Sequence, residues 1–354
     1  MYGTNTTLDT LASSYQSVAK FGLDQAFDAI EDLYEKNNAI VKEEIADLCD
    51  VTTDRLRRAG TPDVATSQEL SELGTPNPQK VQAGAAVGFP LRKFGGAWQG
   101  SFQYLNVVTG NKLAADAVGI MTADLRRIQQ RIRLALYSPL NYTFDDFLVD
   151  HLIQIPLPIK ALANADTMGL PVGPNGETFT NHNHYLARVG GSVAQSDYDG
   201  LVDTVMEHFN AGTPILEINR ADEAFVRTFT GFAPLTDIRV HQPLTALYGL
   251  QPLDVTNTYN RQVGIYRGAE VWVKPRALAG YPICWIRGQK PPLVMREPDF
   301  AQTGMHIEYE GISHPLMSKI WTRFFDISVW NRVNAAVLDT THTGTYVMPT
   351  IPSP

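Results

Sequence analysis

Cysteine is scarce in this chain of 354 residues, which contains only Cys49 and Cys284. Two cysteines are too few for a disulfide scaffold, and they fit a reducing compartment. Long apolar runs are also missing, since no stretch reaches the about 18 apolar residues that a membrane-spanning helix needs. The polar segment from Met1 to Lys20 lacks a basic region followed by an apolar run, so we expect no signal peptide.

Basic charge is in short supply as well. Lysine and arginine number 29 against 37 aspartates and glutamates, which gives a net charge of −8. A chain with this excess of acid does not bind nucleic acid through bulk charge, although a local basic patch remains open. Hydrophobic residues make up 44% of the sequence and charged residues 19%, a globular composition with enough apolar mass for a core.

Residues 8–58 carry the periodicity of a long helix. Apolar residues recur there at steps of three, four or seven and form one stripe: Leu23, Phe27, Ile30, Tyr34, Val41, Ile45 and Leu48. Asp9 is the predicted N-cap. Between Asp28 and Arg55 there are nine acids and three bases, which indicates either a solvated face or a helix that docks on a basic surface. Residues 60–80, rich in glycine and proline, predict an extended arm.

Residues 81–110 carry an alternating pattern that predicts a β-hairpin. Aromatic residues and glycine at positions 98, 100, 102 and 104 share one parity, whereas polar residues at 99, 101 and 103 have the other. The pair Gly95–Gly96 suits a tight turn between this run and the upstream run from Val87 to Leu91. Because a lone two-stranded ribbon is marginal in water, its aromatic face needs another surface. A hairpin packed on its own domain is the alternative.

Residues 112–137 predict a second long helix, which Ser138 and Pro139 end. Its core stripe consists of Met121, Leu125, Ile128, Ile132 and Leu136. Four arginines lie mostly off this stripe and form the strongest basic patch in the chain: Arg126, Arg127, Arg131 and Arg133. They indicate a solvated face, a partner for the acidic N-terminal helix, or a phosphate contact.

The rest of the chain predicts a mixture of helix and strand. Residues 197–210 are typical of an amphipathic helix, and strands are predicted at 214–219, across 263–273 and at 281–286. Residues 305–339 contain long β-rich runs.

No group of residues predicts a catalytic, cofactor or metal site. Asp145 and Asp146 are adjacent in sequence and therefore point apart, which does not suit a pair of catalytic carboxylates. His182 and His184 share a face if their segment is a strand, but no third ligand stands at a motif spacing, so we expect a loop histidine pair rather than zinc. This negative result favours a structural or assembly role.

The order of the elements resembles that of the major capsid proteins of tailed double-stranded DNA phages, the fold named after phage Hong Kong 97. The resemblance covers nearly the whole chain and implies an α+β fold. It implies an N-terminal helix and arm (1–79), an extended loop formed by the hairpin (80–111), a peripheral domain with the spine helix (112–164 and 301–354) and an axial domain (165–300).

The resemblance also implies a function. The chain is expected to self-assemble through pentamers and hexamers into an icosahedral shell that encloses double-stranded DNA without sequence-specific binding. It is expected to be assembled in the host cytoplasm and to belong to the virion. Scaffolding, portal and cement proteins are its expected partners. No membrane association, cofactor or enzymatic activity is expected. The predicted inter-subunit contacts are Phe89, Leu91, Lys93, Trp98, Phe102 and Tyr104.

Further expectations follow for individual residues. The four arginines are predicted to pair with the acidic N-terminal helix. Some family members cross-link a loop lysine to a neighbour's asparagine; Lys93 with Asn331 or Asn334 are the residues to compare, but we expect no cross-link. Trp98→Ala is predicted to leave the subunit folded and to impair assembly.

Two alternatives remain open. An encapsulin-type compartment shares the fold but encloses protein cargo, and a soluble enzyme with an unrecognised site is the second alternative. If the ribbon around Gly95 folds back on its own chain, with no neighbouring copy touching it, the shell interpretation fails.

Overall fold

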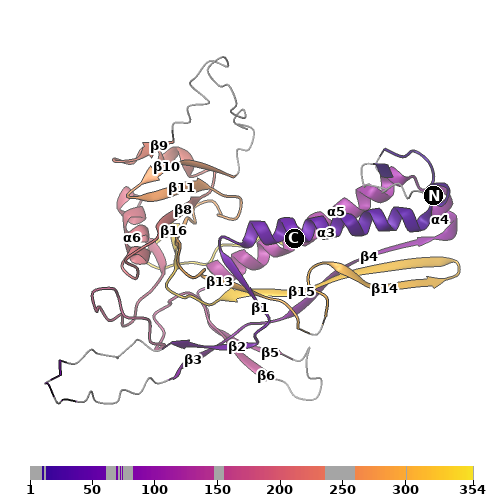
Figure 1. The fold of residues 1–354 in the computed structure, drawn as a ribbon. Coiled ribbons are helices and arrows are strands. Elements are labelled where there is room, and N and C mark those ends of the chain that lie inside the picture. The colour runs from indigo at the N-terminus through magenta and orange to yellow at the C-terminus, as the bar shows by residue number, and fades with distance from the viewer. Residues whose placement is uncertain are drawn as a thin grey trace.

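The computed structural model of the chain describes residues 10–11, 13–60, 69–70, 72, 74, 83–146, 155–235, 260–299 and 301–353. A seven-stranded sheet with helix α6 (Gln195–Met206) forms one end of the molecule. A long arm, in which two helices lie on a narrow sheet, extends away from it (Figure 1).

The N-terminal helical pattern is confirmed only in its first part. After α2 (Val18–Phe21), helix α3 (Leu23–Ile45) buries the predicted apolar stripe from Phe27 to Ile45 but ends well before residue 58. Strands β1 (Cys49–Thr52) and β2 (Leu56–Gly60) follow, so the predicted single helix is wrong there. The β-branched run at residues 51–53 favours extended backbone, and β1 finds a parallel partner in β13 (Leu293–Arg296). Asp9 lies outside the described residues.

The predicted hairpin at residues 81–110 is also wrong. Strand β3 (Ala83–Gly88) pairs with β2, whereas β4 (Arg92–Ser101) runs straight through Gly95 and Gly96 and pairs with β15 (Leu316–Val329). A Cβ atom on Gly95 would lie 2.7 Å from the Trp321 carbonyl oxygen, and one on Gly96 would lie 3.0 Å from Ile120 Cγ2. The glycine pair therefore permits close packing inside a sheet rather than a turn.

The predicted extended arm at residues 60–80 falls mostly outside the described residues. Residues 61–68, 71, 73 and 75–82 belong to that undescribed part.

The strand predicted through position 104 ends at Ser101, where the short helix α4 (Phe102–Val107) begins. The Ser101 hydroxyl accepts a hydrogen bond from the Tyr104 amide and so caps this helix. The long helix predicted at residues 112–137 is confirmed as α5 (Gly110–Tyr137), with Thr109 as N-cap and Ser138 as C-cap. Helices α3 and α5 contact each other and run side by side along the arm (Figure 1).

The arm's sheet is built around β15. Its five strands follow the order β1-β13-β15-β14, with β4 also paired to β15 and β14 spanning His306–Ser313. Along residues 316–322, β15 pairs with β14 on one edge and β4 on the other. Met317, Lys319 and Trp321 of β15 are buried against the helices, where the Lys319 ammonium lies 4.1 Å from the ring centre of Phe27. A separate hairpin pairs β5 (Tyr142–Asp146) with β6 (Ile155–Ile159).

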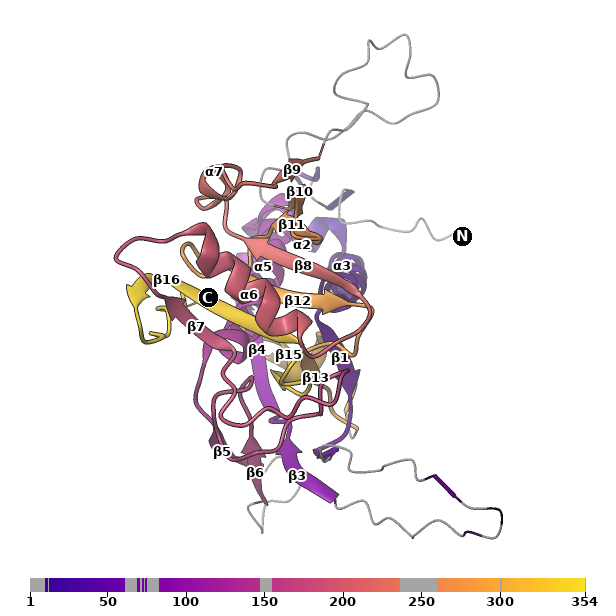
Figure 2. The same ribbon diagram turned by 90° about the vertical axis from the view of Figure 1, so that its left-hand side faces the viewer.

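The seven-stranded sheet confirms the strands and the helix predicted between residues 197 and 286. Its order is β7-β16-β12-β8-β11-β10-β9. The strands are β7 (Tyr185–Arg188), β8 (Thr213–Ile218), β9 (Ala233–Pro234), β10 (Arg261–Tyr266), β11 (Ala269–Val273), β12 (Ile283–Arg287) and β16 (Ala335–Thr343). Helix α6 lies across one face of this sheet (Figure 2), and the short α7 (Glu223–Val226) follows β8.

Two strands lie in a different sheet from the one that the predicted domain bounds imply. Strand β13 falls within residues 165–300 but pairs with β1 and β15 of the arm. Strand β16 falls within residues 301–354 but lies between β7 and β12 of the seven-stranded sheet. The chain therefore crosses between the two sheets on both sides of residue 300, which strand periodicity by itself does not indicate.

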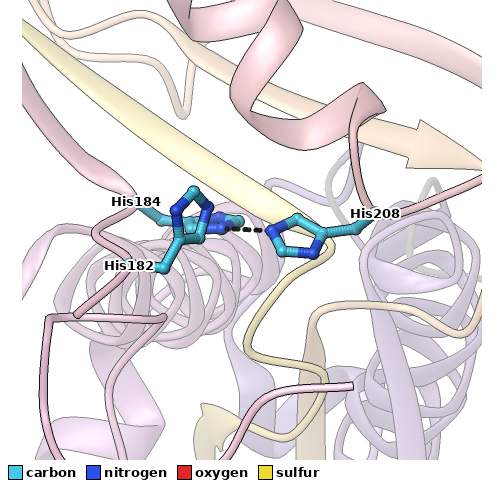
Figure 3. Close-up of side chains that lie close together, drawn as sticks. All are labelled: His182, His184 and His208. Atoms are coloured by element: carbon cyan, nitrogen blue, oxygen red, sulfur yellow. Dashed lines mark hydrogen bonds between the residues drawn. The ribbon is translucent and has the colours of Figure 1, made fainter. Parts of the chain in front are cut away.

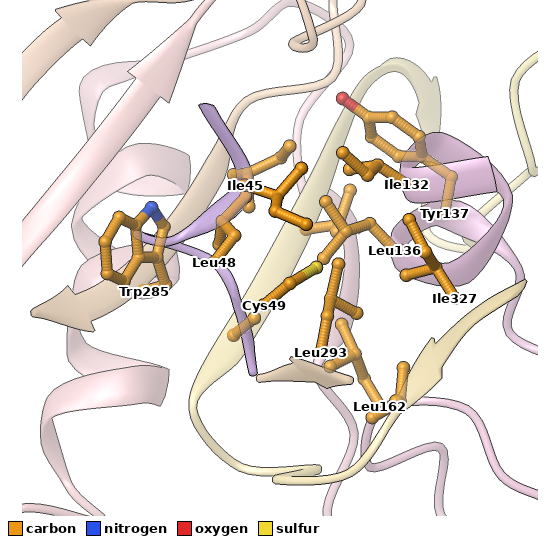
Figure 4. Close-up of a cluster of buried hydrophobic side chains, with 14 of the residues drawn as sticks. Ile45, Leu48, Cys49, Ile132, Leu136, Tyr137, Leu162, Trp285, Leu293 and Ile327 are labelled. Carbon is orange, nitrogen blue, oxygen red and sulfur yellow. The ribbon is translucent and has the colours of Figure 1, made fainter. Parts of the chain in front are cut away.

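A buried apolar cluster joins the arm to the seven-stranded sheet. Ile132 and Leu136 of α5 meet Ile45 at the end of α3, Leu293 of β13 and Trp285 of β12 (Figure 4). All of these side chains are at most 3% exposed, so the two parts of the molecule share one core. Among the described residues, no helix is long and apolar enough to cross a membrane.

Candidate functional site

The aromatic face predicted to contact a neighbour is largely covered by this chain itself. Phe89 and Leu91 are fully buried and Trp98 is 7% exposed. The ring centre of Trp98 lies 5.7 Å from that of Phe27 in α3, in an edge-to-face arrangement. Phe89 packs in the same way on Trp330, at 5.8 Å. The ribbon is thus folded against its own chain, and the prediction that these three side chains form an exposed face is wrong.

The other three predicted contact residues remain accessible. Phe102 is half-buried and stacks on His314 with 5.9 Å between ring centres. Tyr104 is 41% exposed. Lys93 is also partly exposed and forms an ion pair with Glu308 of β14. The structure thus brings Phe102 and Tyr104 together on α4 and places Lys93 on β4, beside β14.

Four exposed apolar residues lie in the elements that form the distal end of the arm. They are Tyr104 and Val107 of α4 with Tyr309 and Leu316 of the β14–β15 pair, which are between 41% and 76% exposed. The two elements touch, because the Phe102 amide donates to the Pro315 carbonyl at 3.0 Å. We call these four residues the distal patch. Exposed apolar groups that gather at one end of a molecule are candidates for interaction sites.

The four arginines of α5 do not pair with α3 in the way predicted. Arg131 donates two hydrogen bonds to Asp326 of β15, at 2.6 and 2.7 Å. Arg133 donates to the carbonyl oxygens of residues 275 and 276. Arg127 donates to Gln130 and lies over the Phe94 ring at 5.2 Å, and Arg126 lines a shallow depression near the C-terminus. Among the described side chains, none of the four forms an ion pair with an acid of α3.

The acids of the N-terminal segment find other partners. Asp47, just after α3, accepts hydrogen bonds from Arg276 at 2.9 and 3.1 Å. The same guanidinium binds the fully buried Glu217 of β8, which also accepts a hydrogen bond from the Trp285 indole at 2.8 Å. Glu31 of α3 lies 4.0 Å from the Lys319 ammonium. These contacts hold the N-terminal segment to its own subunit.

The cysteines offer no reactive thiol. Cys49 and Cys284 are both buried, and burial raises the pKa of each thiol above its usual value. A buried thiol with a raised pKa is a poor nucleophile at neutral pH.

The structure adds a third histidine to the predicted loop pair. His182 and His184 precede β7, and His208, two residues after α6, meets them from the other side (Figure 3). One ring nitrogen from each lies within 4.8 Å of the other two. The sequence analysis missed His208 because its distance along the chain from the pair matches no motif. Its position at the end of a predicted helix was the only available signal.

Comparison with known proteins identifies the fold. No protein family model and no curated protein match this sequence. A solved structure from Mycobacterium phage Patience superposes with a TM-score of 0.66 at 20% identity, covering 100% of this chain and 97% of that chain. The capsid of a native GTA particle superposes with a TM-score of 0.50 at 10% identity, covering 84% and 90%. The predicted α+β capsid fold of the Hong Kong 97 type is thereby confirmed.

Proposed function

We propose that this chain is a major capsid protein that self-assembles into an icosahedral shell around double-stranded DNA. The observation that carries the proposal is a fold likeness to a phage protein over the full length of both chains. The second structure, whose name identifies a capsid, supports the same role. We expect a chain with this role to be a structural protein rather than an enzyme.

The arm provides the surfaces that a shell needs. Helices α3 and α5 cover one face of a narrow sheet, and the distal patch lies where that arm ends. We infer that a neighbouring copy covers the distal patch together with Phe102, and that Lys93 lies at the rim of the same contact. We propose that these contacts are heterologous and that their rotation closes into rings, here pentamers and hexamers.

The packaged DNA is held without sequence recognition. A net charge of −8 gives a mostly acidic subunit, so confinement and counterions hold the genome more than specific contacts do. The protein then belongs to the virion and is assembled in the host cytoplasm. Scaffolding, portal and cement proteins are its expected partners.

One pair of variants tests the assembly surface. Val107 of the distal patch is 76% exposed, and Val189, remote from it in sequence and next to β7, is 86% exposed. We expect Val107→Asp to remain folded by circular dichroism but to form no particles in negative-stain images, whereas Val189→Asp assembles normally. Normal particles from Val107→Asp, or loss of particles in both variants, would contradict the assigned surface.

The wild-type protein decides between the shell and its alternatives. Closed particles that contain DNA support the capsid, and particles that contain an enzyme support an encapsulin-type compartment. A stable monomer at high concentration in size-exclusion chromatography would exclude self-assembly and would leave the soluble enzyme as the alternative.

A further inference from the structure

The three histidines meet in a buried space between the start of β7 and the end of α6 (Figure 3). His184 is fully buried and His208 is 9% exposed, whereas His182 is the most accessible of the three. The Glu207 carboxylate lies beside them, with one oxygen 3.0 Å from the Nε2 atom of His182. Three imidazoles and one carboxylate are a ligand set typical of zinc in proteins.

A backbone carbonyl fixes the proton of the central ring. The Nδ1 atom of His184 lies 2.6 Å from the carbonyl oxygen of Ala335, and this nitrogen must donate because a carbonyl oxygen only accepts. The Nε2 atom of the neutral ring therefore carries a lone pair. That lone pair points to His208, whose Nε2 atom is 3.1 Å away. Metal-binding histidines are usually held in this way, with the second ring nitrogen donating to a carbonyl or carboxylate.

The hydrogen bonds within the cluster leave it unsatisfied. If His208 donates from Nε2 to His184, its Nδ1 atom is a buried acceptor, and it has no partner among the described residues.

The separations suit a small tetrahedral ion. With metal–nitrogen bonds of about 2.0–2.1 Å, neighbouring ligand atoms lie about 3.3 Å apart. The His184–His208 separation of 3.1 Å and the His182–Glu207 separation of 3.0 Å are both close to that value. The widest separation among the three ring nitrogens is up to 4.8 Å, so the rings have to move closer together to bind one ion.

We propose that His182, His184 and His208, completed by the carboxylate of Glu207, bind one divalent transition-metal ion of the zinc type in each subunit. A purely aromatic stack is the simpler reading, since the Phe179 ring lies 4.1 Å from His208 and 5.1 Å from His182. That reading leaves the carboxylate beside the third ring, 3.0 Å from His182 Nε2, without a role.

A bound ion would have a structural consequence. His208 also lines a cleft with Leu170, Lys290 and Trp330, so one of the three rings borders an open space. A bound ion ties the segment before β7 to the end of α6, and His184 links both to β16 through Ala335. Because the ion binds only the folded chain, it should raise the temperature of unfolding. This role is independent of the proposed shell function and of the distal patch.

Zinc titration tests the proposal. The purified chain is stripped with EDTA, dialysed, and titrated with ZnCl2 by calorimetry and with CoCl2 by visible absorption. We expect one ion per chain, the absorption of tetrahedral cobalt, and a higher unfolding temperature with zinc. His182→Asn should weaken binding by at least about tenfold.

His342→Asn is the matched control, because His342 lies 2.8 Å from the Asp339 carboxylate and is the other described histidine paired with an acid. It should bind zinc as the wild type does. Should His182→Asn be poorly folded by circular dichroism, Glu207→Gln replaces it, with weaker zinc binding expected. Absence of saturable zinc binding by the wild type, or unchanged binding in a folded His182→Asn or Glu207→Gln, would overturn the site. Weakened binding in His342→Asn would overturn it as well.

Discussion

Replacing Arg131 by methionine tests the ion pair that joins the long helix to the central strand of the arm. Asp326 is fully buried and accepts two hydrogen bonds from Arg131, at 2.6 and 2.7 Å. Removing one partner of a buried ion pair costs about 3–5 kcal/mol, because the other charge is left uncompensated. Arg92 and the Ile327 amide still donate to Asp326, at 3.0 and 2.7 Å. We therefore expect Arg131→Met to lower the free energy of unfolding by about 3 kcal/mol, the lower end of that range.

Urea unfolding followed by tryptophan fluorescence, at one fixed protein concentration, measures this loss. Lys112→Met is the control, since the Lys112 side chain is 59% exposed and pairs with Asp116 one turn further along α5. Exposed helical pairs contribute far less to stability than buried ones do. Asp326→Asn should lower the free energy of unfolding less in the Arg131→Met background than in the wild type. The reason is that the carboxylate it removes has already lost its main partner. A loss for Arg131→Met no larger than that for Lys112→Met would refute the reasoning.

Three further predictions concern the arm. Gly96→Ala should lower the free energy of unfolding by about 1–3 kcal/mol, because the added Cβ would lie 3.0 Å from Ile120 Cγ2. In an Ile120→Ala background most of that loss should disappear, which a double-mutant cycle by urea unfolding measures. Lys93→Met should raise the pKa of Glu308, which a hydrogen bond from Lys93 holds below its usual value, as carboxyl NMR titration shows. Trp98→Ala should destabilise the subunit itself by about 3–5 kcal/mol in urea unfolding, because the Trp98 side chain is only 7% exposed. This replaces the earlier expectation of a variant that stays folded and fails only in assembly.

Local periodicity was sufficient to predict the elements that have one apolar face. The stripes of α3 and α5, and the strands at 214–219 and 263–273, follow from spacings within a few residues, and the structure confirms them. The Gly95–Gly96 pair could not be interpreted in the same way. Glycine serves equally in a turn and in a close approach of two backbones. Which of the two roles the glycines have depends on whether another strand pairs with them. Thr322, the residue that pairs with Gly95, lies far along the chain, so local sequence does not reveal it.

The histidine cluster illustrates the same limit for a site. His182 and His184 were visible as a pair, but His208 joins them only because α6 folds across the sheet that contains β7 and β16. Nothing in the spacing of the three residues predicts that they meet. The Ala335 carbonyl that orients His184 is a backbone group, so no side-chain pattern marks it. Clusters of this kind come from topology, and a search for motifs does not find them.

Because the strand around Gly95 packs on its own chain, we expect the contact between shell subunits elsewhere on the molecule. The proposal of a shell itself rests on the fold and is retained. An alternating aromatic strand must bury one face, and its parity does not say whether a neighbour or the same chain covers it. Here α3 covers it, with Phe27 on Trp98, so the N-terminal helix takes the place that the sequence analysis gave to a second subunit. What stays uncovered lies beyond that helix, on Tyr104, Val107 and the β14–β15 pair. In the proposed shell, we therefore expect a neighbouring copy to pack on the distal patch rather than on the covered strand.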